Sequence, residues 1–322
     1  MIVTVTLNPA VDKVYWVDSL KLCQATQEEF LTRATRSSTS AGGKGVNMSR
    51  LLSALGTENV AMGFVGGNTG HVVVRYLQNK GVTTNFVWTH EETRVNVVII
   101  ESGSDRSPNL INEHGPRISS QEVARFMRRY RRMLNQASWV VLAGSLPPGI
   151  DSGTYGELAK MARDAGAKVV ISAEGEALTR SLGSCPHLVK PDTRQHLLLD
   201  GKPLTSTEAI IDAGKHVIAC GAEMVIISHH VTGDIAITGD AVWEIRTTVP
   251  TSAFKNLVGA DDAFLAGTLY RLAQEAPVEE SLRFGMAAGL ASAESEKKIC
   301  EDRSMIEKEM EKVSMVRIGG RV

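Results

Sequence analysis

The strongest constraint on the fold is a regular alternation of apolar strands and amphipathic helices in the middle of the chain. Apolar runs predict buried strands at 139–142, 168–172, 187–189 and 223–228, with helices between them at 154–164, 176–182 and 207–219. A strand followed by a helix usually pairs in parallel with the next strand, because the helix carries the chain back to the same edge. The sequence therefore predicts an α/β fold with a mostly parallel sheet flanked by helices.

Two segments in the N-terminal half break this alternation. After a buried strand at 2–7, residues from about 12–40 and 83–115 alternate polar and apolar side chains, as strands with one exposed face do. We expect these segments to form a small β-sheet lid inserted into a single domain that spans residues 1–322. The C-terminal part is predicted to be helical at 260–274, 279–296 and 303–313.

The composition excludes several classes of partner. Of the 322 residues 43% are apolar and 22% charged, and 35 basic residues nearly balance 36 acidic ones. No bulk field therefore attracts nucleic acid or an anionic membrane, and no apolar run approaches the ~20 residues that span a bilayer. Four scattered cysteines, Cys23, Cys185, Cys220 and Cys300, and the lack of a signal peptide predict free thiols and a cytoplasmic location.

A glycine-rich motif, Ala41-Gly42-Gly43-Lys44-Gly45-Val46-Asn47, precedes the first long helical pattern. Glycines let a backbone approach a ligand closely, Lys44 adds a positive charge, and a helix begins at once, as at many anion sites. The motif is not a Walker loop, because Ser38 stands where that motif has its first glycine and Gly45 replaces its Ser or Thr. The alternative is a tight turn without function, which rarely needs this combination of residues.

A second motif, Val258-Gly259-Ala260-Asp261-Asp262-Ala263-Phe264-Leu265-Ala266-Gly267, predicts a loop that leads into a helix. The N–H groups and the dipole at such a helix start form an anion site. A carboxylate beside a bound phosphate can also take the proton from an attacking hydroxyl. Taken alone, however, Asp261 and Asp262 are better explained as helix caps.

Single polar residues add to these two motifs. Asp12 follows the first predicted strand, at the carboxyl end where open α/β sheets bind ligands, although a turn cap is the simpler role. Arg94 is able to clamp a phosphate, although a solvated strand face is the commoner role for a lone arginine. His229 and His230 are neighbours on a predicted strand and face opposite ways, so no metal site is expected.

Five collinear motifs together resemble those of the ribokinase-like (PfkB) carbohydrate kinases: Asn8–Asp12, Ala41–Asn47, Thr93–Asn96, Gly144–Gly149 and Gly259–Gly267. Within that family the chain is most similar to the branch of 1-phosphofructokinases and tagatose-6-phosphate kinases. The resemblance covers nearly the whole chain. It implies a ribokinase-like three-layer fold with a mostly parallel central sheet and a small β-sheet lid over the sugar.

The resemblance also implies a reaction, the ATP-dependent phosphorylation of a ketohexose phosphate of the tagatose 6-phosphate or fructose 1-phosphate type to the bisphosphate. Asp262 would be the catalytic base, and the backbone of Gly259, Ala260 and Asp261 would form the anion hole for the transferred phosphoryl group. The substrate would be bound by Asp12, Arg33, Gly42, Gly43, Lys44, Asn47, Arg94, Asn96 and Ser145. Of these, Arg33, Lys44 and Arg94 would contact its phosphate.

The resemblance further implies a nucleotide site and partners. Lys190, Asp192, Ser228 and Gly233 would bind ATP, with Mg²⁺ carried by the nucleotide and no separate metal site on the protein. The partners are then ATP and a sugar phosphate, and neither nucleic acid nor a membrane. Exposed strand edges of the lid favour a homodimer.

Departures from the family pattern fall on the nucleotide side. Asp261 replaces the third residue of a Gly-Ala/Ser-Gly-Asp motif, Gln195 replaces a glutamate associated with magnesium, and His230 replaces a glycine that meets the nucleotide. A carboxylate ~4 Å from phosphate oxygens costs about 4 kcal/mol at an effective dielectric of about 20. The alternative hypothesis is therefore a catalytically impaired member that acts as a sugar-phosphate sensor or regulatory partner.

Two observations weigh these alternatives. Retention of Asp262 favours the kinase, because a protein freed from catalysis does not need its base. An enzyme for an unphosphorylated sugar or nucleoside is a more distant possibility, because a neutral substrate gives Arg33, Lys44 and Arg94 nothing to pair with.

Overall fold

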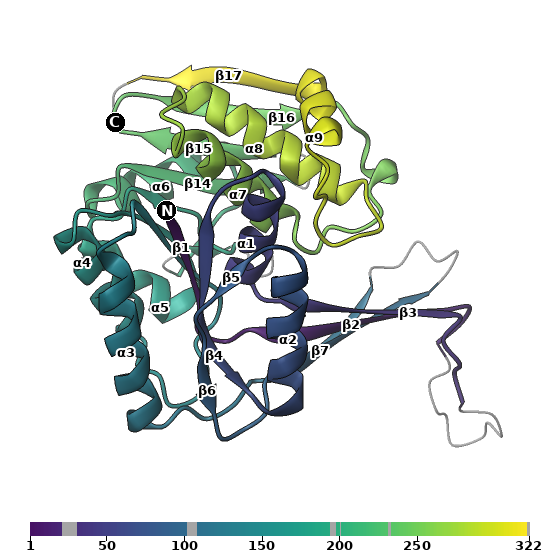
Figure 1. Cartoon of the computed structure of the whole chain (residues 1–322). Helices are drawn as coiled ribbons and strands as arrows, with labels where there is room; N and C mark the ends of the chain where they lie inside the picture. Colours follow the sequence, from purple (N-terminus) through teal and green to yellow (C-terminus); the bar gives the residue numbers. More distant parts are fainter. Residues whose placement is uncertain (21–30, 102–107, 194–197, 200, 231–232, 321–322) are drawn as a thin grey trace.

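The structure is a computed structural model that describes residues 1–322 except 21–30, 102–107, 194–197, 200, 231–232 and 321–322. Gln195 and Cys23 lie outside the described residues, as do the side chains of His229 and His230. The described part of the chain is dominated by a large sheet flanked by helices and a small sheet that projects from it (Figure 1).

The large sheet is mostly parallel. In spatial order its strands are β17 (Val313–Gly319), β16 (Val242–Thr247), β15 (Gly233–Thr238), β14 (Met224–His230), β11 (Leu188–Val189), β10 (Lys168–Ser172), β9 (Trp139–Ala143), β1 (Ile2–Thr6), β4 (Asn59–Gly66) and β5 (Thr83–Thr84), with β6 (Val87–Thr89) also paired to β4. Pairs from β14 to β5 and β6 are parallel, whereas β14 to β17 are joined by antiparallel pairs. The carboxyl ends of the parallel strands meet at one edge, where open α/β sheets bind ligands.

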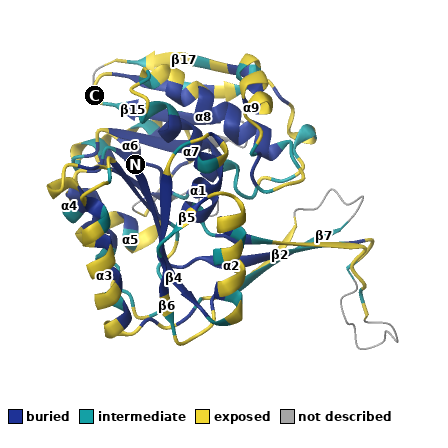
Figure 2. Cartoon of the chain, in the orientation of Figure 1, coloured by how far each residue is buried: buried dark blue, intermediate teal, exposed yellow. Residues whose placement is uncertain are grey.

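Helices cover both faces of this sheet, because the strands send alternate apolar side chains to opposite faces. Val140 and Leu142 of β9 share a core with Phe126, whereas Val141 of the same strand shares a second core with Phe264. The first core includes α3 (Ser120–Leu134), α4 (Thr154–Asp164), α5 (Gly175–Thr179) and α6 (Thr207–Ala219); the second includes α1 (Lys44–Ala54), α7 (Ala260–Leu272), α8 (Val278–Ala293) and α9 (Arg303–Glu309). In Figure 2 the buried strands lie between these partly exposed helices.

Smaller elements complete the described fold. A third core joins α2 (Gly67–Asn79) to the base of the small sheet. Short 3-10 turns lie at Leu182–Ser184, Thr251–Ala253 and Met310–Lys312, and β12 (Leu198–Leu199) pairs with β13 (Lys202–Pro203).

The small sheet has the strand order β3 (Arg36–Gly42), β2 (Ala10–Val17), β7 (Arg94–Glu101) and β8 (Asn109–Asn112). β2 pairs antiparallel with β3 and parallel with β7, so Ala10 lies opposite both Gly42 and Arg94. The same register places Asp12 opposite Asn96. The outer part of β3 is exposed, whereas Asp12 and Gly42 are buried where the small sheet joins the body (Figure 2). Register therefore gathers several polar and glycine residues at this base.

The predicted alternation in the middle of the chain is confirmed. The helices predicted at 154–164 and 207–219 coincide with α4 and α6, and the strand predicted at 168–172 is β10. The prediction that all of 83–115 belongs to the small sheet was wrong. Its first part forms β5 and β6, which pair with β4 of the large sheet and satisfy backbone groups on that side of a buried strand.

The prediction of a helix over 303–313 was also wrong at its C-terminal end. The α-helical part of α9 ends at Glu309, and Val313–Gly319 forms β17, which pairs antiparallel with β16. Met315 and Val316 are adjacent apolar residues, so the segment lacks a strict strand period, and pairing with β16 determines its conformation. Together with β15 and β16, which the sequence analysis did not assign, β17 adds an antiparallel end to the parallel sheet.

Candidate active site

The predicted anion site lies at the start of α7, after a glycine turn. Gly259 precedes the helix with a φ of 91°, in the left-handed region that favours glycine. A Cβ at this position would also lie 2.8 Å from the carbonyl oxygen of Lys298, so the turn needs glycine for space as well. The first turn of α7 consists of Ala260, Asp261 and Asp262. The positive end of the helix dipole lies at this turn.

Asp262 is a buried carboxylate in this first turn. Asn47 Nδ2 donates a hydrogen bond of 2.7 Å to its Oδ2, and Lys44 Nζ lies 3.9 Å from its Oδ1. Burial raises the pKa of Asp262 above its ordinary value, although the charge of Lys44 and the hydrogen bond from Asn47 act in the opposite direction. A carboxylate with a raised pKa beside a helix N-terminus is suited to take a proton from a hydroxyl.

Lys44 is the first residue of α1 and lies between two carboxylates. Its Nζ is 2.8 Å from Asp192 Oδ2, and Gly43 before it has a φ of 109°, which again favours glycine. Burial lowers the pKa of Lys44, but the surrounding carboxylates, Asp262 first, raise it above the ordinary value for lysine. Lys44 therefore keeps its positive charge at the point where the glycine-rich motif meets α7.

Asp12 is the buried centre of a second group, at the base of the small sheet. Asn96 Nδ2 donates a hydrogen bond of 2.9 Å to Asp12 Oδ1, and the ammonium group of Lys298 pairs with Asp12 Oδ2. Gly42 packs against the same carboxylate so closely that a Cβ on Gly42 would overlap it. The structure thus brings three predicted substrate residues together and adds Lys298, which the sequence analysis did not identify.

Two other predicted substrate residues, Arg94 and Ser145, bond to the turn beside this group, whereas Arg33 precedes the far end of β3. Arg94 donates hydrogen bonds to the carbonyl oxygen of Asn8, at 2.9 and 3.2 Å, and to that of Glu113, at 3.1 Å. Asn8 also donates to Ser145 Oγ at 3.2 Å, which brings Ser145 beside the turn after β1. Arg33 is exposed and lies three residues before β3.

Lys190 is the centre of a charge cluster on the predicted nucleotide side. Its Nζ lies 3.0 Å from Asp234 Oδ1, 3.2 Å from Ser228 Oγ and 3.3 Å from Asp261 Oδ1. Lys190 and Asp234 are each 2% exposed, whereas the side chain of Asp261 is 23% exposed. The unusual carboxylate of Asp261 therefore faces a cation, which offsets part of its repulsion toward a phosphate.

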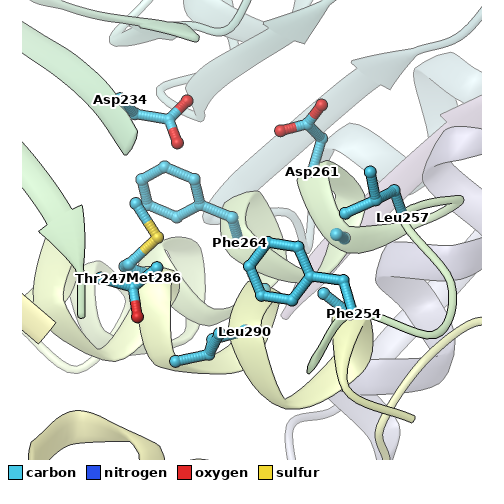
Figure 3. A pocket seen from close by; sticks show the side chains of 11 residues that line it. Asp234, Thr247, Phe254, Leu257, Asp261, Phe264, Met286 and Leu290 are labelled. Carbon is cyan, nitrogen blue, oxygen red and sulfur yellow. The ribbon is translucent and has the colours of Figure 1, made fainter. Parts of the chain in front are cut away.

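A pocket opens beside this cluster (Figure 3). It contains about 430 Å³ of empty space, part of it open to solvent, and its lining side chains are mainly apolar: Phe254, Leu257, Phe264, Met286 and Leu290. Asp234 and Asp261 lie along one edge of the pocket, and Leu290 lies at the opposite edge. Such a pocket suits a ligand with a flat ring system and a charged group. The ring would lie against the apolar side chains, and the charged group would lie toward the start of α7.

Two residues of these groups were missed by the sequence analysis. Asp234 directly follows the predicted nucleotide residue Gly233, so charged neighbours of that motif are the signal by which it could have been found. Lys298 lies in the connection after α8, and no local pattern there indicates that the chain returns to Asp12.

Within the described residues, other kinds of site are not found. No group of three or more His, Cys, Asp or Glu side chains is arranged to hold a metal ion, and no helix is long and apolar enough to cross a membrane. Cys185, Cys220 and Cys300 are free thiols.

Known proteins resemble this chain in both sequence and fold. The model of the pfkB family carbohydrate kinases matches residues 6–301, which include Asp12, the start of α7 and Lys298. The chain belongs to the pfkB family of carbohydrate kinases. Members of this family are kinases that use ATP, and the predicted ribokinase-like fold, with a mostly parallel sheet and a separate small sheet, is confirmed.

Relatives of this pfkB kinase include two curated proteins named 1-phosphofructokinase. The protein from Bacillus subtilis (strain 168) is 34% identical over 296 residues, which cover 92% of this chain and 93% of the relative. The protein from Borreliella burgdorferi is 33% identical over 293 residues, which cover 91% and 92%. A crystal structure of a possible 1-phosphofructokinase from Thermotoga maritima matches with a TM-score of 0.89 and 32% identity, covering 99% of this chain and 100% of that chain.

Proposed function

We propose that this pfkB kinase transfers the γ-phosphoryl group of ATP to the free primary hydroxyl of fructose 1-phosphate and so forms the 1,6-bisphosphate. The observation that carries the proposal is the position of Asp262. This buried carboxylate lies at the start of α7, where Asn47 and Lys44 of α1 contact it. The two relatives named 1-phosphofructokinase, at 33% and 34% identity, support this choice of ketose phosphate.

In the proposed reaction the hydroxyl oxygen attacks the γ-phosphorus, the hydroxyl proton passes to Asp262, and the bond to the β-phosphate oxygen breaks to release ADP. Backbone groups at Gly259, Ala260 and Asp261 stabilise the charge on the transferred group. Lys44, which lies 3.9 Å from Asp262 and 2.8 Å from Asp192, adds a positive charge close to the base. Its position favours a contact with the transferred phosphoryl group as well as with the substrate.

The proposed nucleotide site is the pocket beside Asp261. The apolar walls fit the base, and Lys190 and Ser228 lie at the charged edge where the phosphates would enter. Mg²⁺ bound with ATP would neutralise charge on the β- and γ-phosphates. The carboxylate of Asp192 provides oxygen ligands of the type that Mg²⁺ prefers, so this residue fits the metal-nucleotide complex.

The proposed sugar site lies under the small sheet, which would act as its lid. Asp12 and Asn96 offer hydrogen-bond partners to the sugar hydroxyls, and Gly42, which has no side chain, leaves room for the carboxylate of Asp12. Arg33, three residues before β3, and Arg94 would contact the phosphate already on the sugar. For Arg94 this contact requires it to exchange a main-chain carbonyl for the phosphate, a stronger, charge-assisted partner.

An ADP-release assay with Mg-ATP tests this proposal directly. The panel is fructose 1-phosphate, tagatose 6-phosphate, fructose 6-phosphate and free fructose, with Asp262→Asn as the matched inactive control. Fructose 1-phosphate is expected to give the highest kcat/KM, and a higher value for another sugar would overturn the assignment. If no sugar is phosphorylated, calorimetry on the same panel decides between the remaining hypotheses. Binding of a sugar phosphate without transfer would favour the sensor, and no binding would exclude both the kinase and the sensor.

A homodimer through the lid stays a prediction. The edge strand β8 is exposed along its length, and Leu110 and Ile111 are 51% and 60% exposed. Sedimentation of the parent and of a Leu110→Asp variant would show whether this edge pairs two copies of the chain.

A further inference from the structure

The connection between α8 and α9, residues 294–302, is attached to the small sheet by two ion pairs. Glu296 pairs with Arg36 of β3 at 3.1 Å, and Lys298 pairs with Asp12 of β2. The first pair is exposed, with more than half of each side chain in solvent, and exposed pairs contribute little. In the second pair the side chains are 19% and 5% exposed, so the Lys298–Asp12 pair carries the attachment.

Lys298 also contacts the start of α7. Its carbonyl oxygen lies 2.8 Å from the position of a Cβ on Gly259, so the main chain of Lys298 packs directly on the turn before Ala260. The positive charge of Lys298 is close enough to Asp262 to favour its ionised form. A single residue therefore touches both the carboxylate at the base of the small sheet and the turn that begins α7.

We propose that Lys298 is a positioning residue of the sugar site, which fixes Asp12 and the base of the small sheet relative to the start of α7. A sugar hydroxyl held by Asp12 and a phosphoryl group held at α7 must be aligned to react, and small displacements are costly. This inference rests on the proposed function, because it concerns the same sugar site. It assigns the alignment to a residue outside all five sequence motifs.

The bonds at Asp12 support this role. Asn96 donates to Oδ1 and Lys298 pairs with Oδ2, so a lone pair on each oxygen is left for sugar hydroxyls. Asp12 is 4% exposed, and a carboxylate so deeply buried is strongly destabilised when its cation is removed. Arg94 is near enough to interact with the charge of Asp12, but its hydrogen bonds go to main-chain carbonyl groups. Without Lys298, Asp12 would therefore turn toward solvent and the small sheet would lose its anchor.

Amide hydrogen exchange on the free protein tests the anchor without any substrate. Lys298→Met removes the charge and keeps the length of the side chain, Lys298→Arg restores the charge, and Lys297→Met is the matched control because Lys297 is the exposed neighbour. Amides of β2 and β3 near Asp12 are expected to exchange at least about tenfold faster in Lys298→Met, while those of β9 are unchanged. A charge-assisted bond of this kind accounts for about 10- to 100-fold. Equal exchange in Lys298→Met and Lys297→Met would overturn the proposal.

Steady-state kinetics then test the consequence for the sugar site. In Lys298→Met the KM for the ketose phosphate is expected to rise about 10- to 100-fold while the KM for Mg-ATP stays within about twofold. Lys298→Arg is expected to restore most of the loss. Equal increases in both KM values, or no rescue by arginine, would indicate a general structural role and contradict the proposal. If the parent turns over no sugar phosphate, the proposed function fails, and the exchange result alone decides the role of Lys298.

A double-mutant cycle covers the case in which Lys298→Met folds poorly. In the Asp12→Asn background the buried charge is gone, so adding Lys298→Met is expected to change neither the exchange of β2 nor the thermal midpoint further. Additive effects of the two substitutions would show that the residues act independently and would refute the pairing.

Discussion

Lys190 Nζ lies 3.3 Å from Asp261 Oδ1, and this pair changes how the departure at position 261 is understood. The penalty of about 4 kcal/mol expected for a carboxylate near phosphate applies when nothing compensates it. Here the carboxylate shares a cation with Asp234, and the first turn of a helix also favours negative charge. Asp261 therefore adds a negative charge on the predicted nucleotide side, and Lys190 and the helix start compensate part of it. This compensation favours the kinase hypothesis over the sensor hypothesis.

Lys190→Met is expected to destabilise the fold by about 3–5 kcal/mol, because it removes a buried cation that pairs with the carboxylate of Asp234. Chemical denaturation measures the loss. Adding Asp234→Asn to the same variant removes the buried charge and should restore a large part of the stability. No recovery in the double variant would show that the pair contributes little.

Asp261→Gly is expected to lower the KM for Mg-ATP, because a negative charge beside the phosphates is removed while Lys190 keeps its pair with Asp234. Asp261→Asn is the matched control, since it removes the charge and keeps the size of the side chain. If both variants are slower than the parent, Asp261 has a positive role, for example as a ligand of Mg²⁺. The helix start should lose only about 0.3–1 kcal/mol of stability, because a first-turn carboxylate is lost.

Asp262→Asn is expected to reduce kcat by about 10²–10⁴-fold, the usual contribution of a positioned base. The affinity for the sugar phosphate should stay nearly unchanged, because Asp262 accepts the hydroxyl proton and Asp12 lies at the base of the separate small sheet. Calorimetry of sugar-phosphate binding separates the two effects. Undiminished activity in Asp262→Asn would exclude this residue as the base.

The pH dependence of kcat reports on the same carboxylate. Activity needs ionised Asp262, and burial raises its pKa above the ordinary value, so activity is lost as the pH falls through that raised pKa. Asn47→Ala removes a hydrogen bond to the ionised form and should raise the pKa further, which moves the acidic limb of the profile to higher pH. Asn59→Ala is the control, a buried asparagine whose side-chain amide donates to carbonyl oxygens in α1 and the turn after it. A limb that moves equally in both variants, or not at all in Asn47→Ala, would contradict the assignment.

The sequence predicted the parallel part of the fold because each strand and helix there has its own period and its own turn residues. It assigned β5 and β6 to the wrong sheet and missed β17 as a strand, because these assignments depend on pairing with β4 and β16. Short edge strands carry too few side chains for a local pattern, so tertiary pairing determines them.

The candidate site divides in the same way. Lys44 and Asp262 belong to motifs in which glycine and a helix start accompany the charged residue, and Asp12 follows a predicted buried strand, so local patterns indicate all three. Lys298 is 286 residues from Asp12 along the chain, and only the path of the connection after α8 brings them together. The importance of Asp234 likewise depends on its ion pair with Lys190. Asp234 lies in β15 and Lys190 follows β11, so only the folded sheet brings them together.

Gly42→Ala gives the sharpest test of the sugar side. A Cβ at Gly42 would overlap the carboxylate of Asp12, and the contact cannot be relieved without displacing Asp12 from its bonds with Asn96 and Lys298. We expect the KM for the ketose phosphate to rise by at least about tenfold, with a loss of stability of about 1–3 kcal/mol from overpacking. Gly183→Ala is the matched control, because a Cβ there has open space around it and should leave both quantities unchanged. Normal sugar-phosphate binding by Gly42→Ala, measured by calorimetry, would show that Asp12 does not hold the substrate.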